Sequence, residues 1–199
     1  MKKLMTILLF VVTVLSIKAQ NSYLLTETGE KVTIMGDLKL DFDNVSFKIE
    51  NKEKKKGFEY VGYKDKKIKM IEFVGRVFMV LPDKKNIYLQ EIVCFNDKYI
   101  LTSQFRGGSD YFIKVFDWNF NSICNLKQLF AGKKFQKNDI EDRIKPYFGD
   151  CSNVTDLMAK NIQDQKNQII EDVYAVKCNS TTKSIQDLIK AFLALPVKQ

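Results

Sequence analysis

The sequence predicts an α+β fold, in which an antiparallel β-meander, folded into a curled sheet or small barrel, is followed by a C-terminal helical segment. Three observations predict it. Apolar and polar residues alternate strictly on both sides of a two-residue turn at Asp43 and Asn44. Short runs rich in β-branched and aromatic residues then recur at regular spacing. Near Leu126 this alternation fades and helical periodicity begins. We therefore expect a β-rich domain over residues 20–126 and a helical segment over 127–199 packed on it.

The chain begins with the pattern of a secretory signal peptide. Two lysines precede an apolar run from Leu4 to Ile17, and Ala19 is the small residue before the expected cleavage point. The run is shorter than the roughly 20 residues that a membrane-spanning helix needs. We therefore expect residues 1–19 to be a cleaved signal peptide and the mature protein to be periplasmic, on the cell surface or secreted.

The clearest expected element is a β-hairpin over residues 38–49, because alternate side chains of a strand point to the same face. Asp and Asn at its turn tolerate the positive φ angles that tight hairpins need. The apolar residues that share one face of the hairpin are Leu38, Leu40, Phe42, Val45, Phe47 and Ile49.

Further strands are expected wherever short β-like runs flank turn residues. Two of these runs, 76–81 and 111–117, are apolar on both faces, which favours central strands buried on both sides. The full set covers residues 22–26, 31–35, 58–63, 67–73, 76–81, 87–94, 99–104 and 111–117.

Three helices are expected in the C-terminal segment. Asn138 is predicted to cap the first, which Pro146 ends or breaks; Ser152 or Asn153 caps the second and Ser184 the third. The stretch 169–176 is ambiguous between helix and strand.

Export places the four cysteines in an oxidising compartment, where disulfide bonds form. Four cysteines allow three pairings, and buried free thiols are the alternative. Cys151 follows a predicted turn before one helix and Cys178 follows the next segment, so helical elements folded back on each other bring these two together. Cys94 and Cys124 lie in strand-like segments, and we expect them to pair across the sheet.

The composition argues against most enzyme classes. The chain has no histidine, which excludes Ser-His-Asp and Cys-His nucleophilic sites and His-ligated metals. No two cysteines have the spacing of a structural zinc site, and no phosphate-binding loop is present. Paired acids such as Asp41 and Asp43 are interpreted as surface charge rather than glycosidase carboxylates. We therefore expect no catalytic residue, no cofactor and no metal.

Two surfaces are candidates for binding. The first is the aromatic cluster of the last predicted strand, where Phe116 and Trp118 are the possible ligand-binding residues and Trp118 is expected to be partly exposed. In that strand, Tyr111, Ile113 and Val115 should face the main core, whereas the face with Phe112, Lys114 and Phe116 should be only partly covered. The second is the lysine-rich stretch 48–69, for which protection of hairpin tips and edge strands is favoured over contact with an anionic surface.

Residues 30–175 resemble a group of uncharacterised exported β-rich proteins from Bacteroidetes bacteria. The most distinctive shared piece is the junction Tyr147-Phe148-Gly149-Asp150-Cys151 between two predicted helices. The signal ending at Gln20 and the strands at 31–37, 77–81, 87–89 and 111–114 are similar as well. The group has no known activity, so the resemblance implies an exported location and a fold, and leaves the function open.

Export, a folded core and the missing catalytic motifs lead to one interpretation. We expect a non-catalytic binding or interaction module of the cell envelope, whose partner is an envelope glycan, a lipid or another envelope protein. The alternatives are an Asp/Glu-dependent hydrolase of envelope polymers and a carrier of a small apolar ligand. The expected mature chain is exported and only mildly basic, so nucleic acid is not an expected partner. No stretch after residue 19 is long and apolar enough for a transmembrane helix, so we do not expect an integral membrane protein.

Overall fold

A computed structural model describes residues 22–41, 44–63, 67–83, 86–104, 112–125, 137–152, 154–167, 176–178 and 181–195. The predicted signal peptide over residues 1–19 lies outside the described residues.

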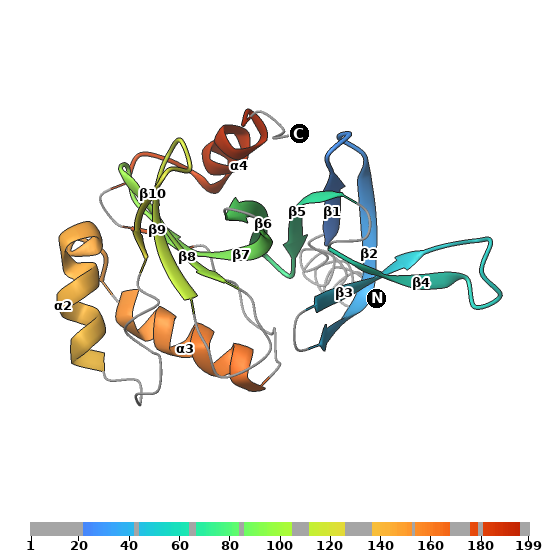
Figure 1. Ribbon diagram of the computed structural model, residues 1–199, viewed down its shortest axis with the longest axis horizontal. Helices are drawn as coiled ribbons and strands as arrows, with labels where there is room; N and C mark the ends of the chain where they lie inside the picture. The colour runs from blue at the N-terminus through green and yellow to red at the C-terminus, as the bar shows by residue number, and fades with distance from the viewer. Residues whose placement is uncertain are drawn as a thin grey trace, which may run out of the picture.

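Within the described residues, the strands form one open sheet that is followed by helices, which confirms the predicted α+β, meander-like fold (Figure 1). The strands are β1 (Tyr23–Thr26), β2 (Lys31–Asp41), β3 (Asn44–Glu50), β4 (Phe58–Gly62), β5 (Ile68–Phe73), β6 (Arg76–Asp83), β7 (Asn86–Phe95), β8 (Tyr99–Gln104), β9 (Phe112–Asp117), β10 (Ser122–Asn125) and β11 (Val176–Lys177). The helices are α2 (Lys137–Phe148), α3 (Val154–Asn167) and α4 (Ile185–Leu193).

Two consecutive antiparallel meanders make up the sheet. Strands β1 to β4 pair in sequence order, as do β5 to β10, and β1 joins the two meanders by pairing with β5 as well as β2. The short strand β11 lies parallel to β7, with Val176 opposite Cys94. The path ends at β4 and β10 without closing, so the structure is the curled sheet rather than the small barrel of the sequence prediction.

The predicted hairpin is present as β2 and β3, with Leu38 opposite Phe47 and Leu40 opposite Val45. Asn44 begins β3 rather than lying in the turn, and residues 42–43 between the strands are outside the described residues. The predicted runs 31–35 and 38–42 are one strand, β2, whose register shifts near Gly36; that glycine has a φ of +74°. Glycine reaches this conformation without the steric penalty that a side chain would bring.

Three hydrophobic clusters form the core. The first lies between β7–β9 and the helices α2 and α3, and includes Val93, Ile113, Ile144, Phe148 and Met158. The second lies within the β1–β5 meander region, around Phe47, Ile71 and Phe73. The third covers the opposite face of the central strands, where Leu188, Ile189 and Phe192 of α4 pack on Met79, Ile92 and Ile100. Strands β7 to β9 therefore have helices over both faces, as Figure 1 shows.

The faces of β9 follow the predicted alternation, but their cover differs from the prediction. Ile113 and Val115 pack in the cluster under α2 and α3. Lys114 and Phe116 point to the other face and are only 5% and 6% exposed, so that face is fully covered at these positions rather than partly. Tyr111 lies outside the described residues.

Candidate functional site

The predicted disulfide between Cys151 and Cys178 is present. Its Cα atoms are 4.7 Å apart, within the range of about 4.4–6.8 Å that the bond requires. Each cysteine is positioned by its backbone: the Cys151 N–H donates to the carbonyl of Phe148 at the end of α2, and the Cys178 N–H donates to the carbonyl of Phe95 in β7. The bond therefore ties the α2–α3 turn to the segment that follows β11.

The second predicted disulfide, between Cys94 and Cys124, was wrong, because both are free thiols. The strand register explains the error. Cys94 in β7 is opposite Leu101 in β8, Leu101 is opposite Val115 in β9, and Val115 is opposite Cys124 in β10. Three strand-to-strand steps of about 4.8 Å separate the two cysteines by roughly 14 Å, well beyond disulfide reach.

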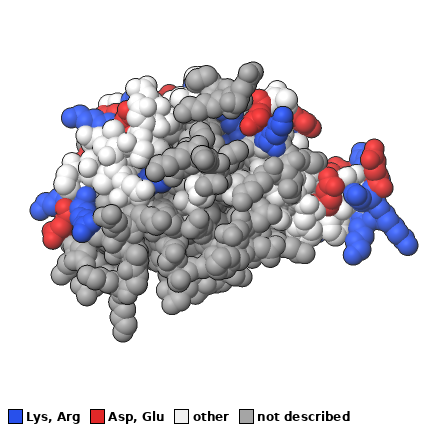
Figure 2. Space-filling view, viewed as in Figure 1, with Lys and Arg blue, Asp and Glu red and all other residues white. Residues whose placement is uncertain are grey.

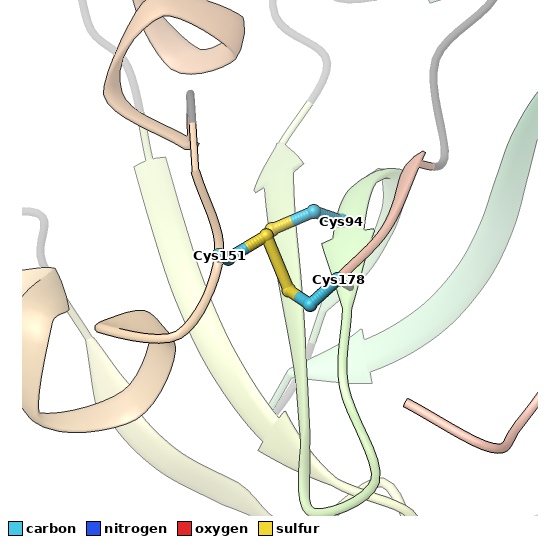
Figure 3. A group of neighbouring side chains, drawn as sticks. All are labelled: Cys94, Cys151 and Cys178. Atoms are coloured by element: carbon cyan, nitrogen blue, oxygen red, sulfur yellow. A yellow bond between two sulfur atoms is a disulfide. The ribbon is translucent and has the colours of Figure 1, made fainter. Parts of the chain in front are cut away.

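Cys94 lies instead beside the Cys151–Cys178 disulfide. The Sγ atoms of Cys94, Cys151 and Cys178 are all within 4.8 Å of one another (Figure 3). A β-bulge between Ile92 and Cys94 shifts the register of β7 against β8. As a result Val93 and Cys94 both join the cluster on the α2 and α3 side, whereas Ile92 and Phe95 join the opposite one. The bulge thus directs Cys94 toward the disulfide.

The three-sulfur cluster of Cys94, Cys151 and Cys178 is shielded from solvent, with exposed fractions of 0%, 7% and 1%. Burial raises the pKa of the Cys94 thiol far above its ordinary value, and the Asp150 carboxylate raises it further. A soft metal ion binds to thiolates, and two of the three sulfurs are already bonded to each other. In this state the cluster is suited to thiol–disulfide chemistry.

The two sequence candidates for ligand binding pack in the cluster that α4 covers. The Phe116 ring is buried and its centroid lies 6.5 Å from that of Phe120. Trp118 is half-buried, and its indole N–H donates to the carbonyl of Asn96 at 2.9 Å. The Lys183 ammonium lies 4.1 Å from the Trp118 ring centroid. The structure therefore surrounds Trp118 with contacts that hold its ring in place.

Asp97, which the sequence analysis did not single out, anchors the approach to α4. Its Oδ1 accepts hydrogen bonds from the Thr181 hydroxyl at 2.6 Å and the Thr182 N–H at 2.8 Å. The Thr181 hydroxyl is the main cause that lowers the pKa of Asp97, with smaller contributions from the Thr182 and Lys183 N–H groups. Residues 181–183 lead into the helix cap at Ser184, so these contacts fix the start of α4.

A second candidate surface is the lysine hairpin, residues 48–60, formed by the end of β3, the start of β4 and the turn between them. Figure 1 shows this hairpin extending away from the rest of the sheet. Its tip, residues 51–57, carries four lysines and one glutamate, and residues 52–57 are exposed. In Figure 2 blue and red side chains gather at this end of the molecule.

Hydrogen bonds order the tip of the lysine hairpin. The Asn51 N–H donates to the Gly57 carbonyl, the Lys54 N–H to the Asn51 carbonyl, and the Gly57 N–H to the Lys54 carbonyl. At its base the Lys48 ammonium lies 4.3 Å from the Phe58 ring centroid, and Phe58 packs edge-on against Tyr60. Tyr60 is 37% exposed. The turn therefore presents its lysines from a defined backbone beside exposed aromatic surface.

Comparison with protein-family models, with curated proteins and with solved structures finds no match for this chain. Among the helices that the structure describes, none has the length and apolar character needed to cross a membrane.

Proposed function

We propose that this protein is an exported, non-catalytic binding module of the cell envelope, and that it holds an anionic polysaccharide through the lysine hairpin. The observation that carries the proposal is the ordered, exposed tip at residues 51–57, where Lys52, Lys54, Lys55 and Lys56 stand on a hydrogen-bonded turn. A clustered positive potential on a protruding element attracts polyanions.

The chemistry of the tip favours a polymer over a bilayer. Residues 51–57 contain no apolar side chain that would insert among lipid tails. Tyr60 and Phe58 lie at the base of the hairpin, where flat rings suit the apolar faces of sugar units. An anionic polysaccharide has negative charges that attract the lysines, and it has sugar-ring faces that can stack on Phe58 and Tyr60.

The disulfide supports the exported location, because such bonds persist mainly in oxidising compartments. The signal-like sequence over residues 1–19 is consistent with the same location. An exported protein meets charged polysaccharides as components of the envelope itself.

Binding to heparin, used as a sulfated polysaccharide probe, tests the proposal. The variant Lys54→Gln/Lys55→Gln/Lys56→Gln should weaken binding by about a hundredfold, since each of the three lysines contributes roughly 1 kcal/mol near an anionic surface. Raising the salt concentration should weaken binding of the unaltered protein, because screening shortens the reach of surface charges. Isothermal titration at two ionic strengths measures both effects.

The matched control is Lys98→Gln/Lys145→Gln/Lys177→Gln, which removes the same charge from exposed positions outside the hairpin and should leave most of the affinity. An equal loss of heparin affinity in both variants would show that net charge, and not the lysine hairpin, determines binding. Binding to anionic lipid vesicles but not to heparin would overturn the choice of partner. If the hairpin variant binds normally but self-associates, its lysines protect the edge strand β4 instead, and the proposal fails.

A further inference from the structure

We propose that Cys94 is an exchange partner of the Cys151–Cys178 disulfide, so that the bond passes among three buried sulfurs within the folded chain. The proposal rests on the three-sulfur cluster, in which every pair of Sγ atoms is within 4.8 Å. It is independent of the function of the lysine hairpin.

Three separate elements hold the sulfurs together. Cys94 is aimed by the bulge in β7, Cys151 follows the end of α2, and Cys178 follows β11. Because Val176 is opposite Cys94 in parallel strands and side chains alternate, Cys178 emerges on the same face as Cys94, two residues further along. A disulfide needs a sulfur separation of about 2.05 Å, so rotations about side-chain bonds cover most of the remaining distance.

The exchange is balanced without an external oxidant or reductant. The Cys94 thiol loses its proton, and the resulting thiolate attacks Sγ of Cys151 or Cys178. A new sulfur–sulfur bond forms as the Cys151–Cys178 bond breaks. The displaced sulfur leaves as a thiolate and takes up a proton, so the chain keeps one disulfide and one thiol in the cluster throughout.

Each product links different parts of the fold. A Cys94–Cys151 bond ties β7 to the α2–α3 turn and releases Cys178, with the segment that leads to α4. A Cys94–Cys178 bond ties β7 to the segment after β11 and releases the α2–α3 turn. Exchange therefore changes which C-terminal element is covalently held to the sheet.

Burial keeps the exchange slow in the closed structure. The attacking species is the thiolate, and the surroundings of Cys94 favour its protonated form. Local opening of the α2–α3 turn, or a rise in pH, should expose more thiolate and speed the exchange.

Single substitutions test the geometry directly, in a Cys124→Ser background that removes the remaining thiol. Each variant is oxidised with oxidised glutathione, which accepts two electrons and two protons to become two molecules of glutathione. Non-reducing peptide mapping should find a Cys94–Cys151 bond in Cys178→Ser and a Cys94–Cys178 bond in Cys151→Ser. The control Cys94→Ser should keep the Cys151–Cys178 bond. Fluorescence of Trp118, the one tryptophan in the sequence, checks that each variant has folded.

A second measurement uses unaltered cluster cysteines, so it does not depend on how the variants fold. The Cys124→Ser protein is incubated at pH 8.5, quenched in acid, unfolded and alkylated with a maleimide. Exchange predicts that part of the label moves from Cys94 to Cys151 or Cys178. If Cys94 alone is labelled, and if Cys94 also stays unbonded in both folded single variants, the exchange proposal is overturned.

Discussion

At the scale of single residues, Trp118 has contacts that its sequence neighbours do not reveal. It lies in a turn after β9, between polar residues, and its half-buried state agrees with the expected partial exposure. The structure gives its indole N–H a carbonyl acceptor on Asn96, places its ring edge-on to Phe95 with centroids 6.1 Å apart, and covers it with Lys183. Through the hydrogen bond from Trp118 to Asn96, the turn after β9 is connected to the turn after β7.

Replacing Trp118 by alanine should lower the free energy of unfolding by about 2 kcal/mol, below the 3–5 kcal/mol typical of fully buried aromatic residues because this ring is half-buried. Urea unfolding followed by circular dichroism measures the change. As a control, Lys183→Gln removes only the cation over the ring and should cost under about 1 kcal/mol. If the urea midpoint of Trp118→Ala were unchanged, the ring would not contribute to stability, and Trp118 would again be a candidate ligand-binding residue.

At the scale of elements, α4 is held at its start, along its face and at its end. Ser184 forms a capping box with Asp187, as its predicted cap position implied. Leu188, Ile189 and Phe192 are buried against the sheet. The Lys69 ammonium donates to the carbonyl of Leu193 at 3.0 Å, where a cation also suits the negative end of the helix dipole.

The attachment of α4 should weaken in acid because of Asp97. Hydrogen bonds hold its folded pKa below the unfolded value of about 3.9, so its contribution to stability is present above that pH. The contribution is lost as the pH falls through the folded pKa. The Ser184 hydroxyl lowers the pKa of Asp187 in the same direction, so both carboxylates contribute to the acid loss.

Trp118 fluorescence, recorded from pH 6 to pH 2, should report this loosening because Lys183 and the Asp97 contacts lie on the same segment. Asp97→Asn should reduce stability at pH 6 and flatten the acid dependence, while keeping the part due to Asp187. An acid transition identical in the two proteins would show that Asp97 does not control the docking of α4.

At the scale of the whole molecule, the disulfide closes a large loop that contains α3. Cys151 and Cys178 are 27 residues apart, and a bond closing a loop of this size stabilises by about 3–4 kcal/mol in the chain-entropy model. Cys151→Ser/Cys178→Ser should lower the free energy of unfolding by that amount in urea titrations. Full stability in the double variant would mean that packing of α2 and α3 alone holds this face of the sheet.

The buried ion pair of Arg76 and Glu91 illustrates what local pattern cannot reveal. Both side chains are fully buried, and the Arg76 guanidinium donates to both carboxylate oxygens of Glu91, from Nη2 to Oε2 at 2.6 Å. In the sequence they are a charged residue at the start of one strand-like run and another in the middle of the next. Only the pairing of β6 with β7 places them on one face between two core clusters.

The sequence by itself determined the elements whose cause is local. Alternation along 38–49 predicts a hairpin because side chains of a strand point to opposite faces, and Ser184 predicts a helix start because its hydroxyl accepts a backbone N–H. Cys124 was placed in a strand-like segment, but the bounds of the exposed four-residue strand β10 were not predicted, since it lacks an apolar pattern. The tertiary structure decided which strands adjoin, that β1 pairs with β5, and that a bulge aims Cys94 at a disulfide formed by two distant cysteines. These outcomes depend on packing between segments far apart in the chain, which no local period encodes.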